Sequence, residues 1–93
     1  MKIIHNGKRY NSAKCEKLAE RDHYSHSNNY SGTSYIVRAT DGQLLILTNA
    51  NGQDCWTTNC FYVPEGEISF DGYYMNDEQV ARCVELGLIE DVQ

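Results

Sequence analysis

The sequence contains no long hydrophobic run: its longest apolar stretches are residues 44–47 and 60–63. A helix that spans a bilayer needs about 20 predominantly apolar residues, so we expect no membrane-spanning helix and no membrane partner. The first residues, Met-Lys-Ile-Ile-His-Asn-Gly, also lack the apolar stretch of a signal peptide. The sequence therefore predicts a cytoplasmic protein.

Basic residues are scarce in the second half of the chain. Residues 42–93 contain nine acidic residues and one basic residue, Arg82, whereas residues 1–41 contain seven basic and four acidic residues. The net charge of −5 therefore divides into +3 for the first part and −8 for the second. An acidic surface of this kind repels nucleic acid and attracts basic protein surfaces.

Motifs for catalysis or cofactor binding are missing as well. The seven glycines are scattered and form no glycine-rich phosphate loop, and no cysteine or serine lies in a recognisable nucleophile signature. Cys55 and Cys60 are spaced for a pair of zinc ligands, but only His23 and His26 could supply a second close pair. We predict a protein that is not an enzyme and has no cofactor, with metal binding at Cys55 and Cys60 as an open alternative.

What the sequence does contain is two apolar segments on either side of Asp41-Gly42, within residues 35–49. Asp-Gly is typical of a two-residue hairpin loop of type I′. With this loop, the predicted cross-strand pairs are Thr40–Gln43, Ala39–Leu44, Val37–Ile46 and Tyr35–Thr48. One face of the hairpin would carry Tyr35, Val37, Ala39, Leu44 and Ile46, and the other would carry Ile36, Leu45 and Leu47. Because both faces are apolar, we expect further elements to cover each of them.

Shorter signals predict the other strands. Asn6-Gly7 predicts a hairpin within residues 2–10. The latter part of residues 55–63 and residues 68–70 are predicted as short strands, whereas residues 23–34 have no periodicity and are predicted as a loop.

Two helices are predicted. The first begins at Ser12 and runs to about Asp22, since Cys15, Leu18 and Ala19 fall at helical spacing. The second begins at the N-cap Asn76, with Gln79 placed for a capping box, and ends at Gly87 with Leu88 folding back on Cys83. The expected buried stripe of this helix is Val80, Cys83 and Val84. The sequence thus predicts one α+β domain over residues 1–93, with a small antiparallel sheet of four or five strands and two helices packed on it.

Aromatic residues in polar segments indicate a binding surface. Two of the seven tyrosines, Tyr24 and Tyr30, fall within residues 23–34, and Trp56 falls within residues 49–60. Protein interfaces are enriched in such side chains. Acidic residues would steer the chain toward a basic partner. The predicted protein-binding residues are Tyr24, Tyr30, Trp56, Asp71, Asp77, Glu78 and Glu85.

The order of these parts resembles that of small proteins carried by bacteriophages and other mobile elements. The resemblance lies in the opening hairpin Lys2-Ile-Ile-His-Asn-Gly-Lys-Arg-Tyr-Asn, a short helix, the strand pair around Asp41-Gly42 and the closing helix Met75-Asn-Asp-Glu-Gln-Val-Ala. Some of those proteins are anti-CRISPR inhibitors, which are similar in size and acidity. The resemblance implies a non-enzymatic inhibitor in the bacterial host cytosol. Such an inhibitor would bind a CRISPR effector protein, a Cas nuclease or surveillance complex, and block its nucleic-acid binding or activation without binding nucleic acid directly. No matched motif carries over a role for a single residue.

The basic N-terminal third supports an alternative function. A small regulatory or nucleic-acid-associated protein of a mobile element could use these charges together with Tyr10, Tyr24 and Tyr30, because phosphates attract lysine and arginine and bases stack on aromatic rings. The sequence predicts neither the type of effector nor the oligomeric state.

Overall fold

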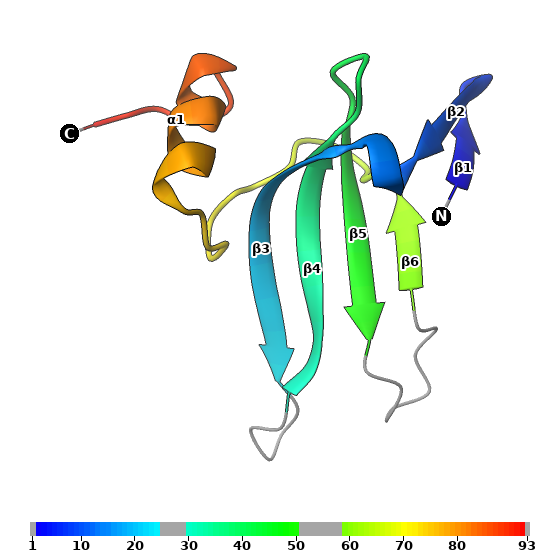
Figure 1. Ribbon diagram of the computed structural model, residues 1–93, viewed down its shortest axis with the longest axis horizontal. Helices are drawn as coiled ribbons and strands as arrows, with labels where there is room; N and C mark the ends of the chain where they lie inside the picture. Colours follow the sequence, from blue (N-terminus) through cyan, green and yellow to red (C-terminus); the bar gives the residue numbers. More distant parts are fainter. Residues whose placement is uncertain (1, 25–29, 51–58, 93) are drawn as a thin grey trace.

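The computed structural model describes residues 2–24, 30–50 and 59–92. Its centre is a four-stranded antiparallel sheet with the strand order β3-β4-β5-β6 (Figure 1). The strands of this sheet are β3 (Glu16–Tyr24), β4 (Tyr30–Arg38), β5 (Leu44–Ala50) and β6 (Asn59–Tyr62). A separate hairpin and one α-helix complete the described fold: β1 (Lys2–His5), β2 (Lys8–Asn11) and α1 (Asp77–Glu85). The predicted α+β class is confirmed. No helix in the described ranges is long and apolar enough to cross a membrane.

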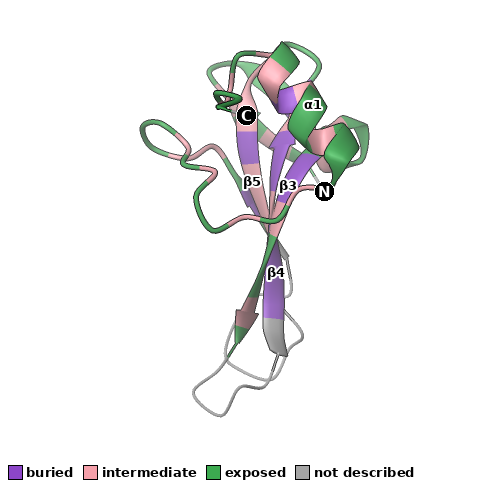
Figure 2. Cartoon of the chain, turned by 90° about the vertical axis from the view of Figure 1, so that its left-hand side faces the viewer, coloured by how far each residue is buried: buried purple, intermediate pink, exposed green. Residues whose placement is uncertain are grey.

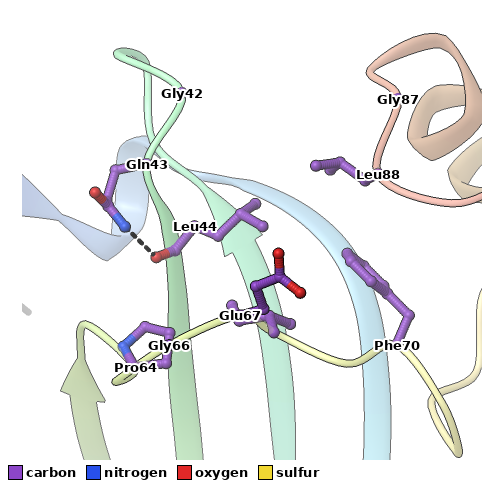
Figure 3. Close-up of a pocket in the computed structure, with 10 residues that line it drawn as sticks. Gly42, Gln43, Leu44, Pro64, Gly66, Glu67, Phe70, Gly87 and Leu88 are labelled. Atoms are coloured by element: carbon purple, nitrogen blue, oxygen red, sulfur yellow. Dashed lines mark hydrogen bonds between the residues drawn. The ribbon is translucent and has the colours of Figure 1, made fainter.

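Different parts of the chain cover the two faces of the sheet. On one face, Tyr10 of β2 is buried together with Val37, Leu45 and Phe61. Residues 63–76, which we term the crossing segment, run from β6 to β3 over the other face (Figure 3). Tyr74 in this segment forms an isolated antiparallel bridge with Glu20 of β3, and α1 lies beside β3, at the end of the sheet away from β6 (Figure 1). Buried residues occur in β3, β4 and β5, and those of β4 continue beyond the covering elements (Figure 2).

The predicted helix from Ser12 to Asp22 is wrong. Only a single 3-10 turn, η1 (Ser12–Lys14), forms there, and β3 follows it. In β3, Lys17 pairs with Val37 and Ala19 pairs with Ile36, so Leu18 is the extra residue of a β-bulge. Both Leu18 and Ala19 are fully buried. A bulge lets two successive residues face the core, and it therefore produced an apolar pattern that is easily taken for helical spacing. The described residues contain one α-helix rather than the two that were predicted.

The predicted loop over residues 23–34 is also largely wrong, because Tyr24 ends β3 and Tyr30 begins β4. Polar side chains stabilise this part of the sheet. Thr33 Oγ1 donates a hydrogen bond to Asp22 Oδ1 at 2.8 Å, His23 Nε2 lies 2.6 Å from Ser34 Oγ, and Ser34 Oγ lies 3.1 Å from Thr48 Oγ1. Apolar periodicity could not reveal strands that are held by polar pairs across the sheet.

The central hairpin is confirmed, but its register differs from the prediction by one residue. Val37 pairs with Leu45 and Tyr35 with Leu47. Ala39 N donates to Gln43 O and Gly42 N donates to Ala39 O, both at 2.9 Å. Gly42 has a positive φ of 94°, whereas Asp41 does not, so the loop has three residues and a glycine bulge instead of the two-residue type I′ turn. The shift turns β5 over relative to β4, which places Leu45 beside Val37 and Leu44 beneath the crossing segment.

The remaining turns and caps mostly follow the sequence. Asn6 and Gly7 both have positive φ angles, 51° and 74°, in the β1–β2 turn. The predicted strand in the latter part of residues 55–63 is confirmed as β6, but residues 68–70 belong to no strand.

The capping prediction for α1 is confirmed at both ends. Asn76 forms a capping box with Gln79, and Leu88 N donates to Cys83 O at 2.9 Å to close a Schellman motif. The predicted buried stripe is wrong at Val80, which is 37% exposed because α1 lies beside β3 and Cys83 is its buried contact residue.

Asp41 joins the central turn to the β1–β2 hairpin. Its carboxylate accepts hydrogen bonds from Gln43 N at 3.0 Å and from Tyr10 Oη at 2.9 Å, and Lys8 Nζ lies 3.5 Å away. The hydrogen bond from Gln43 N lowers the pKa of Asp41 most strongly, and the bond from Tyr10 and the charge of Lys8 lower it further. Burial raises the pKa of Tyr10, and the hydrogen bond to Asp41 adds to this effect.

Replacing Leu18 by Ala should lower the free energy of unfolding by about 2–5 kcal/mol, because the substitution leaves a cavity at a fully buried position. Urea denaturation monitored by circular dichroism measures this loss. Ile4 is 78% exposed, so Ile4→Ala serves as the control and should change the free energy by less than about 0.5 kcal/mol. Equal effects of the two substitutions would contradict the burial of Leu18.

Acid should destabilise the wild type more than an Asp41→Asn variant. The folded-state pKa of Asp41 is lowered, so its carboxylate stabilises the fold above the unfolded-state pKa of about 4, and this contribution is lost as the pH falls through the folded-state value. Urea midpoints measured between neutral pH and pH 2 should fall more steeply for the wild type. Parallel curves for the two proteins would show that Asp41 has no such role.

Candidate protein-binding surface

The C-terminal part of the chain forms an acidic surface. Residues 63–92, which we term the acidic layer, comprise the crossing segment, α1 and the residues after it. All eight acidic residues of the layer are exposed: Glu65, Glu67, Asp71, Asp77, Glu78, Glu85, Glu90 and Asp91. Its one basic residue is Arg82, whose Nε lies 3.0 Å from Glu16 Oε2 and whose Nη1 lies 3.3 Å from Glu85 Oε1. The layer therefore presents negative charge to solvent while its single cation is already paired.

The predicted acidic residues fall at three places in this layer. Asp71 lies in a turn of the crossing segment, where its N–H donates to Ser69 Oγ at 3.2 Å. Asp77 and Glu78 occupy the first turn of α1, where the helix dipole favours negative charge. Glu85 is the last residue of α1 and carries the ion pair with Arg82. Asp71, Asp77 and Glu78 thus flank Tyr74 in the chain, whereas Glu85 lies at the opposite end of the helix.

An aromatic pocket lies at the β3 edge. Tyr24 at the end of β3 is 61% exposed and Tyr74 is 66% exposed, and both line a pocket of about 400 Å³ together with Arg21 and Gly72. The sequence prediction included Tyr24 but missed Tyr74, which follows the Asp71-Gly72 turn and precedes the cap of α1.

Tyr30 and Trp56 are the other two predicted aromatic residues. Tyr30 begins β4 and pairs with Tyr24 across the hairpin, so the backbone brings these two predicted positions together. Trp56 lies outside the described residues.

A second pocket, which we term the Glu67 pocket, lies between the crossing segment, the β4–β5 turn and the residues after α1 (Figure 3). Its volume is about 440 Å³. In Figure 3 the carboxylate of the exposed Glu67 points toward the space between the side chains of Leu44, Phe70 and Leu88. Sequence reasoning missed this pocket because the predicted register of β5 was wrong. The pocket also joins Leu44 and Leu88, which lie far apart in the chain.

Basic residues gather in the first elements of the chain. Four of them lie in β1, β2 and η1, namely Lys2, Lys8, Arg9 and Lys14. Arg9 and Lys14 line a smaller pocket of about 230 Å³ with Cys15 and Thr40. These basic residues and the acidic residues of the acidic layer therefore lie in different structural elements.

The described cysteines differ in exposure. Burial raises the pKa of Cys83 and of Cys15, and the charge of Asp41 also raises that of Cys15, so both thiols are protonated at neutral pH. Cys60 is exposed in β6. Within residues 2–24, 30–50 and 59–92, no three His, Cys, Asp or Glu side chains are grouped to hold a metal ion. Cys55 and His26, which the zinc alternative requires, lie outside these ranges.

No protein-family model, curated protein or solved structure matches this chain.

Iodoacetamide should label Cys60 faster than Cys83 by about tenfold or more, because only the exposed thiol is accessible and burial keeps Cys83 protonated. Peptide mass spectrometry after timed labelling measures each rate. Labelling of both cysteines at the same rate would contradict the burial of Cys83. The same experiment with added Zn²⁺ tests the metal alternative, since ligation by Cys55 and Cys60 would protect Cys60 from labelling.

Proposed function

We propose that this chain is a non-enzymatic binding module whose acidic layer docks on the basic, nucleic-acid-binding surface of another protein. Following the resemblance described above, we propose a CRISPR effector as the target, a Cas nuclease or surveillance complex, whose nucleic-acid binding or activation the chain blocks. The observation that carries the proposal is the exposure of all eight acidic residues in a layer whose only cation is paired within the molecule.

Exposed charges and exposed aromatic rings would contribute to binding in different ways. Exposed charges raise the rate of encounter with an oppositely charged surface, and they contribute less to the lifetime of the complex. Exposed tyrosines supply contact area at a low cost in conformational entropy. Tyr24 and Tyr74 border the part of the acidic layer that contains Asp71, which supports a contact surface around the β3 edge. Tyr30 and Trp56 stay predictions for the same surface.

Removing charge from this region should slow association with the target. We expect the triple variant Asp71→Asn, Asp77→Asn and Glu78→Gln to associate roughly tenfold more slowly with a purified effector at low salt, and to show a flatter dependence on salt. Surface plasmon resonance against a panel of purified Cas effectors measures both quantities.

The matched control removes three charges of the opposite sign, Lys2→Gln, Arg9→Gln and Lys14→Gln. It should leave association with the effector unchanged or slightly faster. The proposal would be overturned if an effector bound the triple variant of Asp71, Asp77 and Glu78 as fast as the wild type. It would also be overturned if no effector of the panel bound the wild type.

One observation favours the alternative function, which is nucleic-acid association through the basic N-terminal third. Arg9 and Lys14 line a pocket that also contains Thr40, and this combination of cations and a hydroxyl group suits a phosphate. The nearby Asp41 carboxylate is already occupied by hydrogen bonds from Tyr10 and Gln43.

A gel-retardation assay with single-stranded and duplex DNA separates the two functions. If the alternative is right, the wild type should retard DNA at moderate salt. The variant lacking Lys2, Arg9 and Lys14 should lose this binding. The variant lacking the carboxylates of Asp71, Asp77 and Glu78 should keep it. DNA that migrates freely with the wild type would remove the alternative.

A further inference from the structure

We propose that the Glu67 pocket receives one arginine side chain of the bound protein. This inference rests on the proposed function and adds to it the chemical identity of a central contact. It concerns a site that lies apart from the aromatic pocket at the β3 edge and from the acidic residues predicted from the sequence.

Four apolar side chains in the lining of the pocket can contact the apolar stem of a long side chain. Leu44 forms the wall on the side of the sheet, Ile68 and Phe70 line it from the crossing segment, and Leu88 lines it from the residues after α1. Its volume of about 440 Å³ lies within the usual range of about 300–1,000 Å³ for ligand pockets. Arginine and lysine bury their methylene groups along apolar surface and keep the charged head at the polar end.

The charge of the pocket selects a cation. Glu67 projects its carboxylate into the space between Leu44, Phe70 and Leu88 (Figure 3). The ion pairs among the described residues involve Lys8 with Asp41 and Arg82 with Glu16 and Glu85, and they leave Glu67 available to a partner. The acidic layer around the pocket adds a negative potential that favours the same sign of ligand.

Two features favour arginine over lysine. A guanidinium group is planar and binds a carboxylate through two parallel hydrogen bonds, and it also stacks on aromatic rings. The Glu67 carboxylate and the Phe70 ring lie on the same pocket and offer both contacts. A cation of the chain already lies on the turn side, since Arg38 Nη2 is 3.4 Å from the place that a Cβ on Gly42 would occupy. An incoming guanidinium would therefore enter from the Glu67 side.

The direct test uses short peptides as probes. The probe is acetyl-Gly-Ser-Arg-Ser-Gly-amide, and the control is the same peptide with citrulline, which has the shape of arginine without its charge. Titration of the ¹⁵N-labelled full chain should give saturable amide shifts in residues 42–44, 66–70 and 87–88. The citrulline peptide should bind about tenfold more weakly, because it loses a charge-assisted pair of hydrogen bonds.

A pair of neighbouring substitutions separates the pocket from general charge. Glu67→Gln should weaken binding of the arginine peptide about tenfold. Glu65→Gln removes the same charge two residues away, does not line the pocket, and should change the affinity by less than about twofold. Equal effects of the two substitutions, equal affinity for the citrulline peptide, or shifts spread over the whole acidic layer would overturn the inference.

The same two variants show which proposal fails if binding to the effector is measured in parallel. An effector that binds the wild type, but is weakened equally by Glu65→Gln and Glu67→Gln, would overturn the arginine pocket and leave the proposed function standing. Specific binding of the arginine peptide without binding to any effector would overturn the proposed function and leave the arginine pocket standing.

Discussion

The hydrogen bonds of Asp41 are the constraint on which the rest of the structure depends. The carboxylate accepts from Gln43 N within the turn and from Tyr10 Oη of β2, so one side chain fixes the shape of the central hairpin and also holds the β1–β2 hairpin against the sheet. The turn that it stabilises contains three residues, with Gly42 at a positive φ of 94°. That turn sets the register of β4 against β5, and the register decides which side chains of β5 face each covering element.

The register then connects the core to the candidate site. Leu45 packs with Val37 and Tyr10 in the main core, and the adjacent Leu44 faces the crossing segment, where it lines the Glu67 pocket. A two-residue turn would exchange the faces of these two leucines. The acidic layer depends on the sheet in a second way, because the bridge between Tyr74 and Glu20 and the ion pair between Arg82 and Glu16 attach it to β3. The surface that carries the charge is thus held by contacts at the start and in the middle of β3.

Sequence reasoning predicted best where structure is encoded locally. The Asn6-Gly7 turn and the caps at Asn76 and Gly87 each involve residues within a few positions of one another, so their chemistry is visible in the sequence. Leu18 was misassigned because a bulge, which only pairing with β4 creates, buries two successive residues. The candidate acids were predicted from composition. Tyr74 and the Glu67 pocket were not predicted, because the bridge of Tyr74 to β3 and the lining of the pocket join residues that are far apart in the chain.

The proposed function depends on the division of charge between structural elements. The acidic layer exposes its carboxylates, while the basic side chains gather in the first elements. The most direct test of the central claim is hydrogen–deuterium exchange of the chain alone and in complex with a purified CRISPR effector. The account predicts slower exchange in the crossing segment and α1, with β1 and β2 unchanged. Protection confined to β1, β2 and η1 would contradict it and would assign binding to the basic side of the molecule.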